Sequence, residues 1–185
     1  MLSVNDEIKE EASLALKSLR SLGAEKLIML SGDRAENAER VSKTLSLDEC
    51  HAELLPEEKY KMIEKLTDTS GENLAYVGDG INDAPSLALA SVGVAMGSLG
   101  SDSAISASDV VLVSDNLEKL PRSIKIARKT LRIAKENIVF ALGVKFLIMA
   151  LGAFGLANMW LAVFADVGVA VIAILNSMRT LRLKK

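Results

Sequence analysis

Apolar positions in the first 118 residues follow two alternating spacings. Short continuous apolar runs bounded by turn residues predict buried strands, and between them apolar residues recur every three or four positions, as on one face of a helix. The strands are expected at 26–30, 50–54, 74–77, 92–95 and 110–113. The helices are expected at 8–19, 35–45, 83–90 and from Pro56 onward. This alternation predicts an α/β fold with a mostly parallel, doubly wound sheet.

The pattern changes after residue 116. Residues 117–136 read as an amphipathic, basic helix that Pro121 interrupts early. Two long apolar stretches follow, 138–157 with Lys145 as its only charge and 159–175 with Asp166 as its only charge. Each is close to the roughly 20 residues that a helix needs to cross a bilayer. A buried hairpin of a soluble core is the alternative, but a chain of this size leaves little to cover it, so we predict two transmembrane helices.

Charge separates the same two regions. Residues 1–118 contain 10 Lys and Arg against 22 Asp and Glu, whereas residues 119–185 contain 12 against 2. The positive charge flanks apolar runs and has no basic aromatic surface beside it, which favours membrane contact over nucleic-acid binding. Basic residues before the first span and after the second predict that both ends of the hairpin, and the acidic domain, face the cytoplasm. The expected segments are an acidic domain (1–118), a connecting helix (119–136), a membrane hairpin (137–178) and a basic tail (179–185).

Candidate chemistry follows two of the predicted strands. The segment Gly78-Asp79-Gly80-Ile81-Asn82-Asp83 places two carboxylates and an amide around a glycine turn. Oxygen ligands of this kind suit Mg²⁺ beside a phosphate, and glycine lets the backbone approach closely. Ser31-Gly32-Asp33 also follows a strand, and ligands of such sheets bind beyond the carboxyl ends of the strands. An ordinary Asp-Gly turn and a helix capped by Asp33 are the plainer interpretations of the two segments.

The first of these segments continues into Ala84-Pro85 and, after a short helix, 90–97, and this run resembles the hinge region of P-type ATPases. These are cation pumps of the haloacid dehalogenase superfamily. Further segments match in the family's order, namely Ser31-Gly32-Asp33, Pro56-Glu57-Glu58-Lys59 and Asp109-Val110-Val111-Leu112. The resemblance covers almost the whole chain. It implies a Rossmann-like phosphorylation domain of the haloacid dehalogenase type, followed by a two-helix transmembrane hairpin.

The resemblance also implies a role for each matched residue in ATP-driven phosphoryl transfer. Ser31 and Gly32 would bind the phosphoryl oxygens, Asp33 would lie towards the nucleotide, and Lys59 would balance the phosphate charge. Asp79 would ligate Mg²⁺, with Asn82 and Asp83 in support. Such a cradle of metal, lysine and hydroxyl provides most of the stabilisation that phosphoryl transfer requires.

The family's phosphorylated motif, Asp-Lys-Thr-Gly-Thr, does not occur in this sequence. In the family it lies upstream, with the nucleotide-binding domain in between, so the resemblance implies a C-terminal part of a pump. The strand that would carry the nucleophile, between those ending near Ser31 and Asp79, would then be missing. We expect the chain alone to be inactive, and the gap either to close by a non-native pairing or to leave the domain loosely folded. The implied partners are the lipid bilayer, the nucleotide-binding and actuator domains and the other membrane helices.

Lys145 and Asp166 are equally distant from the turn at 155–156, about 15 Å at the rise of a helix, and so near the midplane of a bilayer. Opposite charges at equal depth are expected to pair. Charges in a membrane are costly and so indicate function, although a purely structural ion pair is the alternative. Both residues resemble those of the zinc, cadmium and lead subgroup of P-type ATPases. The resemblance implies that Asp166 binds the transported Zn²⁺, Cd²⁺ or Pb²⁺ with cysteines of an earlier helix, and that Lys145 is its counterion.

The expected function is therefore a part of a heavy-metal efflux pump in the cell membrane. Three other interpretations share the same residues. The chain could be a separate subunit that completes a split pump, or a non-catalytic interaction protein that keeps the fold. It could also be a membrane-anchored phosphatase of the same superfamily, which would need a nucleophile of its own.

Overall fold

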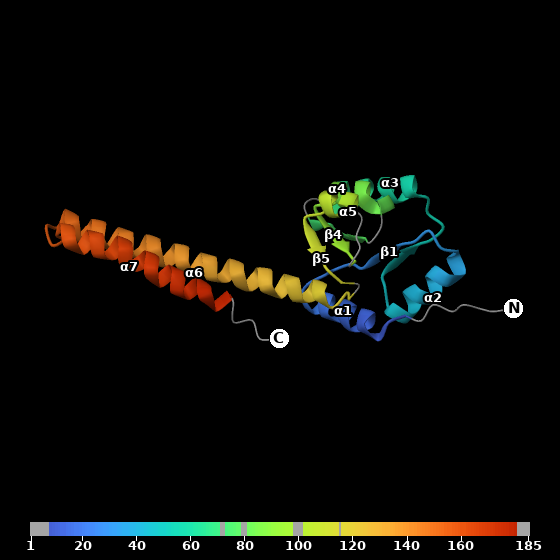
Figure 1. Ribbon diagram of the computed structural model, residues 1–185, viewed down its shortest axis with the longest axis horizontal. Helices are drawn as coiled ribbons and strands as arrows, with labels where there is room; N and C mark the ends of the chain where they lie inside the picture. The colour runs from blue at the N-terminus through green and yellow to red at the C-terminus, as the bar shows by residue number, and fades with distance from the viewer. Residues whose placement is uncertain (1–7, 71–72, 79–80, 98–101, 115, 181–185) are drawn as a thin grey trace. The chain divides into compact units, whose positions relative to one another are not determined.

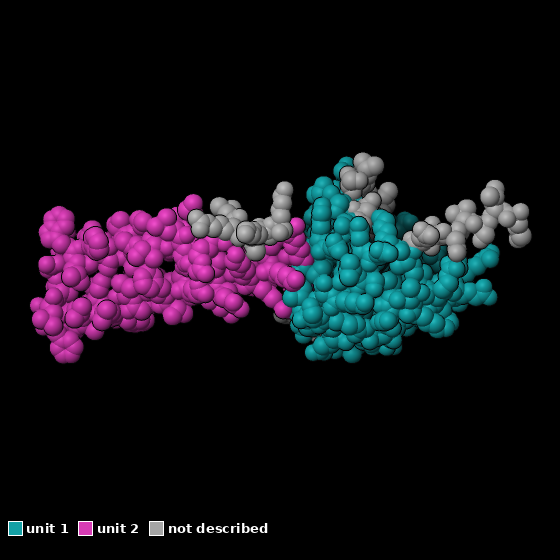
Figure 2. Space-filling view, turned by 90° about the horizontal axis from the view of Figure 1, so that it is seen from below, with its two compact units in different colours: residues 1–121 teal, residues 122–185 magenta. Residues whose placement is uncertain are grey.

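The computed structural model describes residues 8–70, 73–78, 81–97, 102–114 and 116–180. The chain divides into two compact units, residues 1–121 and 122–185, which Figure 2 colours separately. The first unit contains strands and helices in alternation, and the second consists of helices.

The first unit follows the alternating order that the apolar spacing predicts (Figure 1). Its strands are β1 (Ile28–Leu30), β2 (Glu49–His51), β3 (Ala75–Gly78), β4 (Val92–Met96) and β5 (Val110–Leu112). Its helices are α1 (Glu10–Ser21), α2 (Ala35–Leu45), α3 (Pro56–Ser70), α4 (Ala84–Leu89) and α5 (Asp102–Ala107), with the 3-10 turn η2 (Ile81–Asp83) before α4. Figure 1 shows α3, α4 and α5 on one side of the strands and α1 and α2 on the other.

The strands form two parallel ladders. One joins β1 to β2, with Met29 opposite Cys50, and the other has the order β3-β4-β5, with Val77 opposite Val94 and Val94 opposite Val110. The predicted α/β fold with parallel strands is confirmed. Among the described residues no ladder joins β1 to β3, so the gap that the resemblance implies is not closed by a non-native pairing.

A cluster of buried apolar residues lies between α4, α5 and β4. Leu87, Ala95 and Ala104 are buried there, against Tyr76 and Ala107. Gly93 allows this packing, because a Cβ at that position would lie 2.3 Å from the carbonyl oxygen of Leu87. The Gly93 amide donates to Asp109 Oδ2 at 2.9 Å, which ties β4 to the start of β5. The Asp109 segment therefore has a structural role in addition to its place in the family pattern.

Two predicted boundaries are wrong for identifiable reasons. The second strand ends at His51 and not at 54, because Glu53 adopts φ 58° and its amide donates to the carbonyl oxygen of Asp33 at 2.9 Å. Pro121 does not interrupt the basic helix, since it lies in the first turn of α6 (Lys119–Ala153), where a missing amide costs no hydrogen bond. Helix α5 was not predicted, because its six residues are too few to display a helical spacing.

The second unit contains most of α6 together with α7 (Met159–Ser177) and the turn η3 (Met178–Thr180). The predicted connecting helix and first span are one helix of 35 residues. The chain reverses at Gly155, which has φ +72°, and Asn158 caps α7 by accepting from the Leu161 amide at 2.8 Å. By length and composition both helices could cross a membrane, and none of their most apolar stretch is buried. That exposure argues against the soluble core hairpin.

Candidate functional site

Asp83 is the centre of a cluster at the carboxyl end of β3. It is the N-cap residue of α4, directly before Ala84-Pro85, and only 9% of its surface is exposed. Tyr76 Oη donates a hydrogen bond to Asp83 Oδ1 at 2.9 Å. Lys59 Nζ lies 3.6 Å from the same oxygen. A buried carboxylate requires such partners, because leaving it unpaired would cost several kcal/mol.

The backbone of β3 is shaped around this carboxylate. A Cβ at Gly78 would lie 3.0 Å from Asp83 Cβ and 3.1 Å from Asp83 Oδ2, so a side chain there would displace the aspartate. Tyr76 and Gly78 point to the same face of the strand because they are two residues apart. The strand thus presents a hydroxyl to Asp83 and leaves it room.

Lys59 reaches the cluster from the first turn of α3. Glu58 fixes that turn, because its Oε2 accepts from the Leu55 amide at 2.8 Å, and the Lys59 amide donates to the Leu55 carbonyl at 3.0 Å. The side chains of Lys59 and Asp83 are only 22% and 13% exposed. Little water screens this ion pair, so the ammonium and the carboxylate form a fixed polar pair.

Ser31, Gly32 and Asp33 form a second turn, at the carboxyl end of β1. Ser31 Oγ accepts from the Asp33 amide at 3.1 Å, and the Ser31 amide donates to His51 O at 2.9 Å. A Cβ at Gly32 would lie 3.3 Å from the Leu54 carbonyl oxygen, which keeps this position small. Both candidate turns therefore follow the carboxyl ends of parallel strands, the usual place for a ligand site in such folds.

The proposed magnesium ligands are only partly described. Asp79 lies outside the described residues, and Asn82 is exposed on η2. Within the described residues no group of three or more His, Cys, Asp or Glu side chains could hold a metal ion. Asp83 Oδ1 already accepts from Tyr76, which suits a supporting carboxylate better than a principal ligand. The magnesium assignment stays a prediction.

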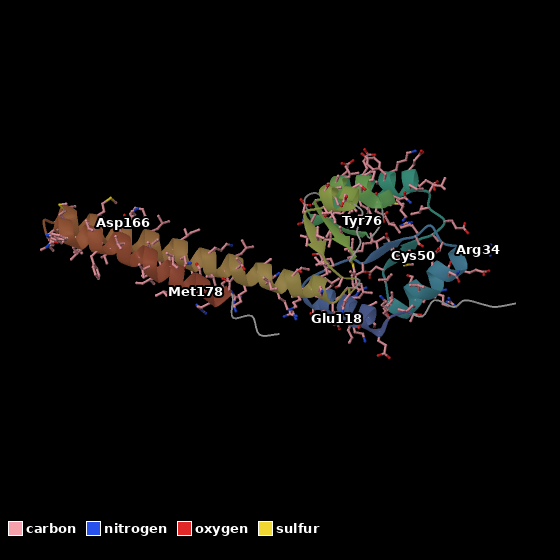
Figure 3. All side chains as sticks on the ribbon, in the orientation of Figure 1. Arg34, Cys50, Tyr76, Glu118, Asp166 and Met178 are labelled. Atoms are coloured by element: carbon pink, nitrogen blue, oxygen red, sulfur yellow. The ribbon has the colours of Figure 1, made fainter. Side chains whose placement is uncertain are left out.

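In the second unit, Lys145 and Asp166 pair as expected. Lys145 Nζ lies 3.7 Å from Asp166 Oδ1, and the two side chains are 77% and 76% exposed on the surface of the helix pair. Figure 3 labels Asp166 on α7 and Tyr76 in the first unit. The pairing joins the only two charges of the predicted spans.

Tyr76 is the residue of the cluster that sequence reasoning missed. The sequence contains the signal that could have found it. Tyr76 lies two positions before Gly78, so both residues point to the same face of the strand. The hydroxyl of a tyrosine in a half-buried strand needs a partner, and Asp83 provides it.

Comparisons with known proteins agree with the fold. Residues 1–91 match the family model of the haloacid dehalogenase-like hydrolases. The chain is 55% identical over 177 residues to the zinc-transporting ATPase of Synechocystis sp., covering 95% of this chain and 24% of that protein. It is 51% identical over 183 residues to the cadmium, zinc and cobalt-transporting ATPase of Bacillus subtilis, covering 98% of this chain and 26% of that protein.

A solved structure of a zinc-transporting PIB-type ATPase in the E2.Pi state matches with a TM-score of 0.86 at 38% identity. This match covers 96% of this chain and 29% of that one. The chain spans about a quarter of the length of the curated relatives it matches. With both units aligned to these proteins, the chain belongs to the PIB-type ATPases, a group of P-type ATPases in the haloacid dehalogenase superfamily.

Proposed function

We propose that this chain is part of an ATP-driven efflux pump for a divalent heavy-metal ion, Zn²⁺, Cd²⁺ or Pb²⁺. It would supply the phosphate cradle of the phosphorylation domain (1–118) and, through a connecting helix (119–136), a membrane hairpin (137–178) with a basic tail (179–185). The observation that carries the proposal is the pair Lys145 and Asp166, 3.7 Å apart on two otherwise uncharged apolar stretches. Ionisable groups in a membrane are retained at a cost and so indicate a functional site.

The charge pattern supports a membrane position with both hairpin ends in the cytoplasm. Basic side chains precede the apolar part of α6 and follow α7. One depression on α6 has both basic and apolar side chains in its lining, namely Arg128, Arg132 and Lys135 with Leu131, Val139 and Phe140, beside the acidic Glu136. Such a mixture suits the boundary between lipid headgroups and acyl chains.

The transport role follows from the charges. The Asp166 carboxylate would bind the dication, together with ligands from helices outside this chain, and the Lys145 ammonium would pair with Asp166 once the ion has left. A cation held next to the emptied site repels a returning dication. Lys145 is thus proposed as the counterion that keeps the emptied site neutral.

In the first unit, Lys59 and Ser31 would neutralise and hydrogen-bond the phosphoryl group transferred from ATP. Gly32 would let the phosphate approach the backbone, and Asp33 would lie towards the nucleotide. Asp79, supported by Asn82 and Asp83, would hold Mg²⁺, which balances phosphate charge. The contact between Lys59 and the buried Asp83 supports this proposal, because it holds the lysine at the carboxyl end of β3.

We also propose that the chain is catalytically inactive alone. No Asp-Lys-Thr-Gly-Thr motif occurs in it, and the edges of β1 and β3 that have no partner among the described strands would accept a parallel strand that brings the nucleophile. The isolated chain should therefore hydrolyse neither ATP nor p-nitrophenyl phosphate with Mg²⁺. Hydrolysis that Lys59→Met abolishes would favour the membrane-anchored phosphatase. A separate polypeptide carrying the motif that copurifies with the chain would favour the split pump.

The function is tested by metal-stimulated ATP hydrolysis of a full-length pump that contains this segment. Zn²⁺, Cd²⁺ or Pb²⁺ should stimulate hydrolysis, and Cu⁺ should not, because a carboxylate paired with a lysine suits a dication better than a soft monovalent ion. Stimulation by Cu⁺ alone would contradict the proposal.

A further inference from the structure

Helices α6 and α7 face each other through a row of buried and half-buried residues. On α6 the row recurs every three or four positions, the spacing of paired helices. Its members there are Ile133, Asn137, Ala141, Val144, Ile148 and Leu151. On α7 the corresponding residues are Ala165, Gly168, Val169, Ala173 and Asn176. Apolar and small residues of this kind fit many alignments of two helices, so the row alone does not specify how far one helix is shifted along the other.

Two asparagines interrupt the apolar row opposite one another. Asn137 Nδ2 donates to Ser177 Oγ at 2.9 Å and to the Ala173 carbonyl oxygen at 3.2 Å. Asn176 Nδ2 donates to Asn137 Oδ1 at 2.8 Å. Asn137 therefore uses both its donor and its acceptor group across the helix interface. We call Asn137, Asn176 and Ser177 the asparagine clasp.

An ion pair borders the clasp. Arg179 Nη1 donates to Asn176 Oδ1 at 2.8 Å and lies 3.6 Å from Glu136 Oε2. Arg179 orients the Asn176 amide so that its nitrogen faces Asn137. The hydrogen bonds thus form a continuous chain from α7 to α6 and back.

The hydrogen bonds of the asparagine clasp and the contact between Lys145 and Asp166 require the same alignment of the two helices. Lys145 follows Asn137 by eight residues and Asp166 precedes Asn176 by ten, about 12 and 15 Å along the helices. A shift by one turn, about 5.4 Å, would separate the two charges and also break every bond between the asparagines. Lys145 and Asp166 are exposed on the flank of the helix pair, whereas Asn137 and Asn176 are half-buried within the interface.

We propose that the asparagine clasp sets the register of α6 and α7 and thereby positions Lys145 opposite Asp166. A polar residue in an apolar helix interface specifies register because every other alignment leaves its amide without a partner. The importance of this alignment rests on the proposed function, in which Asp166 binds the metal. The alignment itself depends only on the two helices.

The test is disulfide cross-linking of the full 185-residue chain in lipid nanodiscs, in a Cys50→Ser background and without metal. Asp166→Cys is combined with Ala141→Cys, Lys145→Cys or Met149→Cys, which lie one turn apart on α6. These changes remove the ion pair, so only the rest of the interface can set the register. With the clasp intact, position 145 should cross-link most rapidly. In Asn137→Leu with Asn176→Leu, this preference should fall about tenfold, the effect of one or two interhelical hydrogen bonds.

Two further variants separate hydrogen bonding from packing. Asn137→Asp keeps the size of the wild-type asparagine and can still accept from Asn176, but it loses the two bonds that Asn137 Nδ2 donates, so its preference for position 145 should lie between those of the wild type and the double leucine variant. Asn158→Ser removes the third asparagine of the hairpin and keeps a hydroxyl to cap α7, so it should leave the preference unchanged.

An unchanged preference for position 145 in the double leucine variant would overturn the proposal. A wild-type preference in Asn137→Asp would also overturn it, because the size of the side chain and not its hydrogen bonds would then explain the effect. Since no metal is present, neither result depends on Asp166 being a metal ligand. That assignment fails separately, if Asp166→Ala leaves metal-stimulated hydrolysis intact in the full-length pump.

Discussion

Among single residues, Asp83 shows how the first unit accommodates a charge in a protected place. Its Oδ1 receives the Tyr76 hydroxyl and faces the Lys59 ammonium, and Gly78 leaves it space. Tyr76 lies on β3 and Lys59 on α3, so the carboxylate at the start of α4 ties β3, α3 and α4 together. Hydrogen bonds to charged groups contribute more than those between neutral groups.

Tyr76→Phe removes one of these bonds and leaves the ring in place. We expect the free energy of unfolding of the first unit to fall by about 1.5 kcal/mol, because the buried carboxylate loses a donor. Urea unfolding followed by far-ultraviolet circular dichroism measures this. Tyr60→Phe, the other tyrosine, is the matched control and should change the value by less than about 0.5 kcal/mol. Equal effects of the two substitutions would contradict the role of Tyr76.

Gly93→Ala tests the close approach of α4 and β4. Its Cβ would lie 2.3 Å from the Leu87 carbonyl oxygen, so the backbone would have to move. We expect a loss of about 3 kcal/mol in the same urea experiment, at the upper end for overpacking. Gly143→Ala has no neighbour within 4 Å and should leave the first unit's transition unchanged. A loss below about 0.5 kcal/mol for Gly93→Ala would contradict the prediction, because α4 and β4 would then move apart at little cost.

Most residues around Asp83, and the pair Lys145 and Asp166, could be predicted from the sequence. The former lie in contiguous motifs, and the latter are isolated charges in apolar runs. Lys145 and Asp166 could be paired from their equal distance to the turn, and the ion pair confirms this. The spacing of Tyr76 and Gly78 shows that they share a face of the strand, but the hydrogen bond from Tyr76 to Asp83 and the asparagine clasp could not be predicted, because their partners come from separate elements. Which side chains meet across elements depends on tertiary packing, which local spacing does not encode.

Among the elements, β2 is held at its start by charges from α1 and the loop before β1. The Leu27 amide donates to Asp48 Oδ2 at 2.7 Å, and Arg20 contacts the same oxygen at 2.9 Å. The Leu27 amide, which has the larger effect, and the Arg20 guanidinium hold the pKa of Asp48 below its ordinary value of 3.8. Lys26, 2.6 Å from Glu49, likewise lowers the pKa of Glu49. These contacts align β2 beside β1.

Asp48→Asn should destabilise the first unit at neutral pH but not in acid. The folded pKa lies below the unfolded one, so the contribution of Asp48 is fully present above about pH 4 and is lost as the pH falls through the folded pKa. Urea midpoints of the variant and the wild type should therefore differ at pH 6 and converge at about pH 2. Glu39→Gln, which breaks only the exposed pair with Lys43, is the control and should show little difference at either pH. A difference for Asp48→Asn that persists at about pH 2 would show that charge is not the cause.

The elements themselves were predictable where the apolar spacing was long, as in α2, α3 and the two long helices. The boundaries were less predictable. Glu53 ends β2 through a left-handed conformation that its sequence position does not announce. Pro121 was expected to interrupt a helix, yet the helix starts two residues before it, and only the start position decides which effect a proline has.

At the scale of the whole molecule, the two sheets of the first unit stay separate. β4 has a partner on each side, whereas the structure pairs β1 only with β2 and β3 only with β4 among the described strands. Unpaired edges leave amide groups open to water or to another strand. The fold class could be predicted from the sequence, and so could the gap, because the resemblance locates the absent strand between β1 and β3.

Hydrogen exchange of the isolated chain tests this gap. Amides of 28–30 and 75–78 should exchange at least about tenfold faster than those of 92–96, because β4 alone is paired on both sides among the described strands. A peptide that carries the Asp-Lys-Thr-Gly-Thr strand should slow exchange in β1 and β3. Equal protection of all three strands in the isolated chain would contradict an open gap.

In the proposed function, the chain contributes a metal-binding carboxylate, Asp166, to a pump. Zinc-stimulated ATP hydrolysis of a full-length pump that contains this segment tests this role, with Asp166→Ala compared with the wild type. We predict loss of zinc stimulation in the variant, because the dication loses its carboxylate ligand. Asp102→Ala, which changes an aspartate in the first turn of α5, should retain it. Zinc stimulation that persists at the wild-type level in Asp166→Ala would contradict the assignment of Asp166 as a metal ligand.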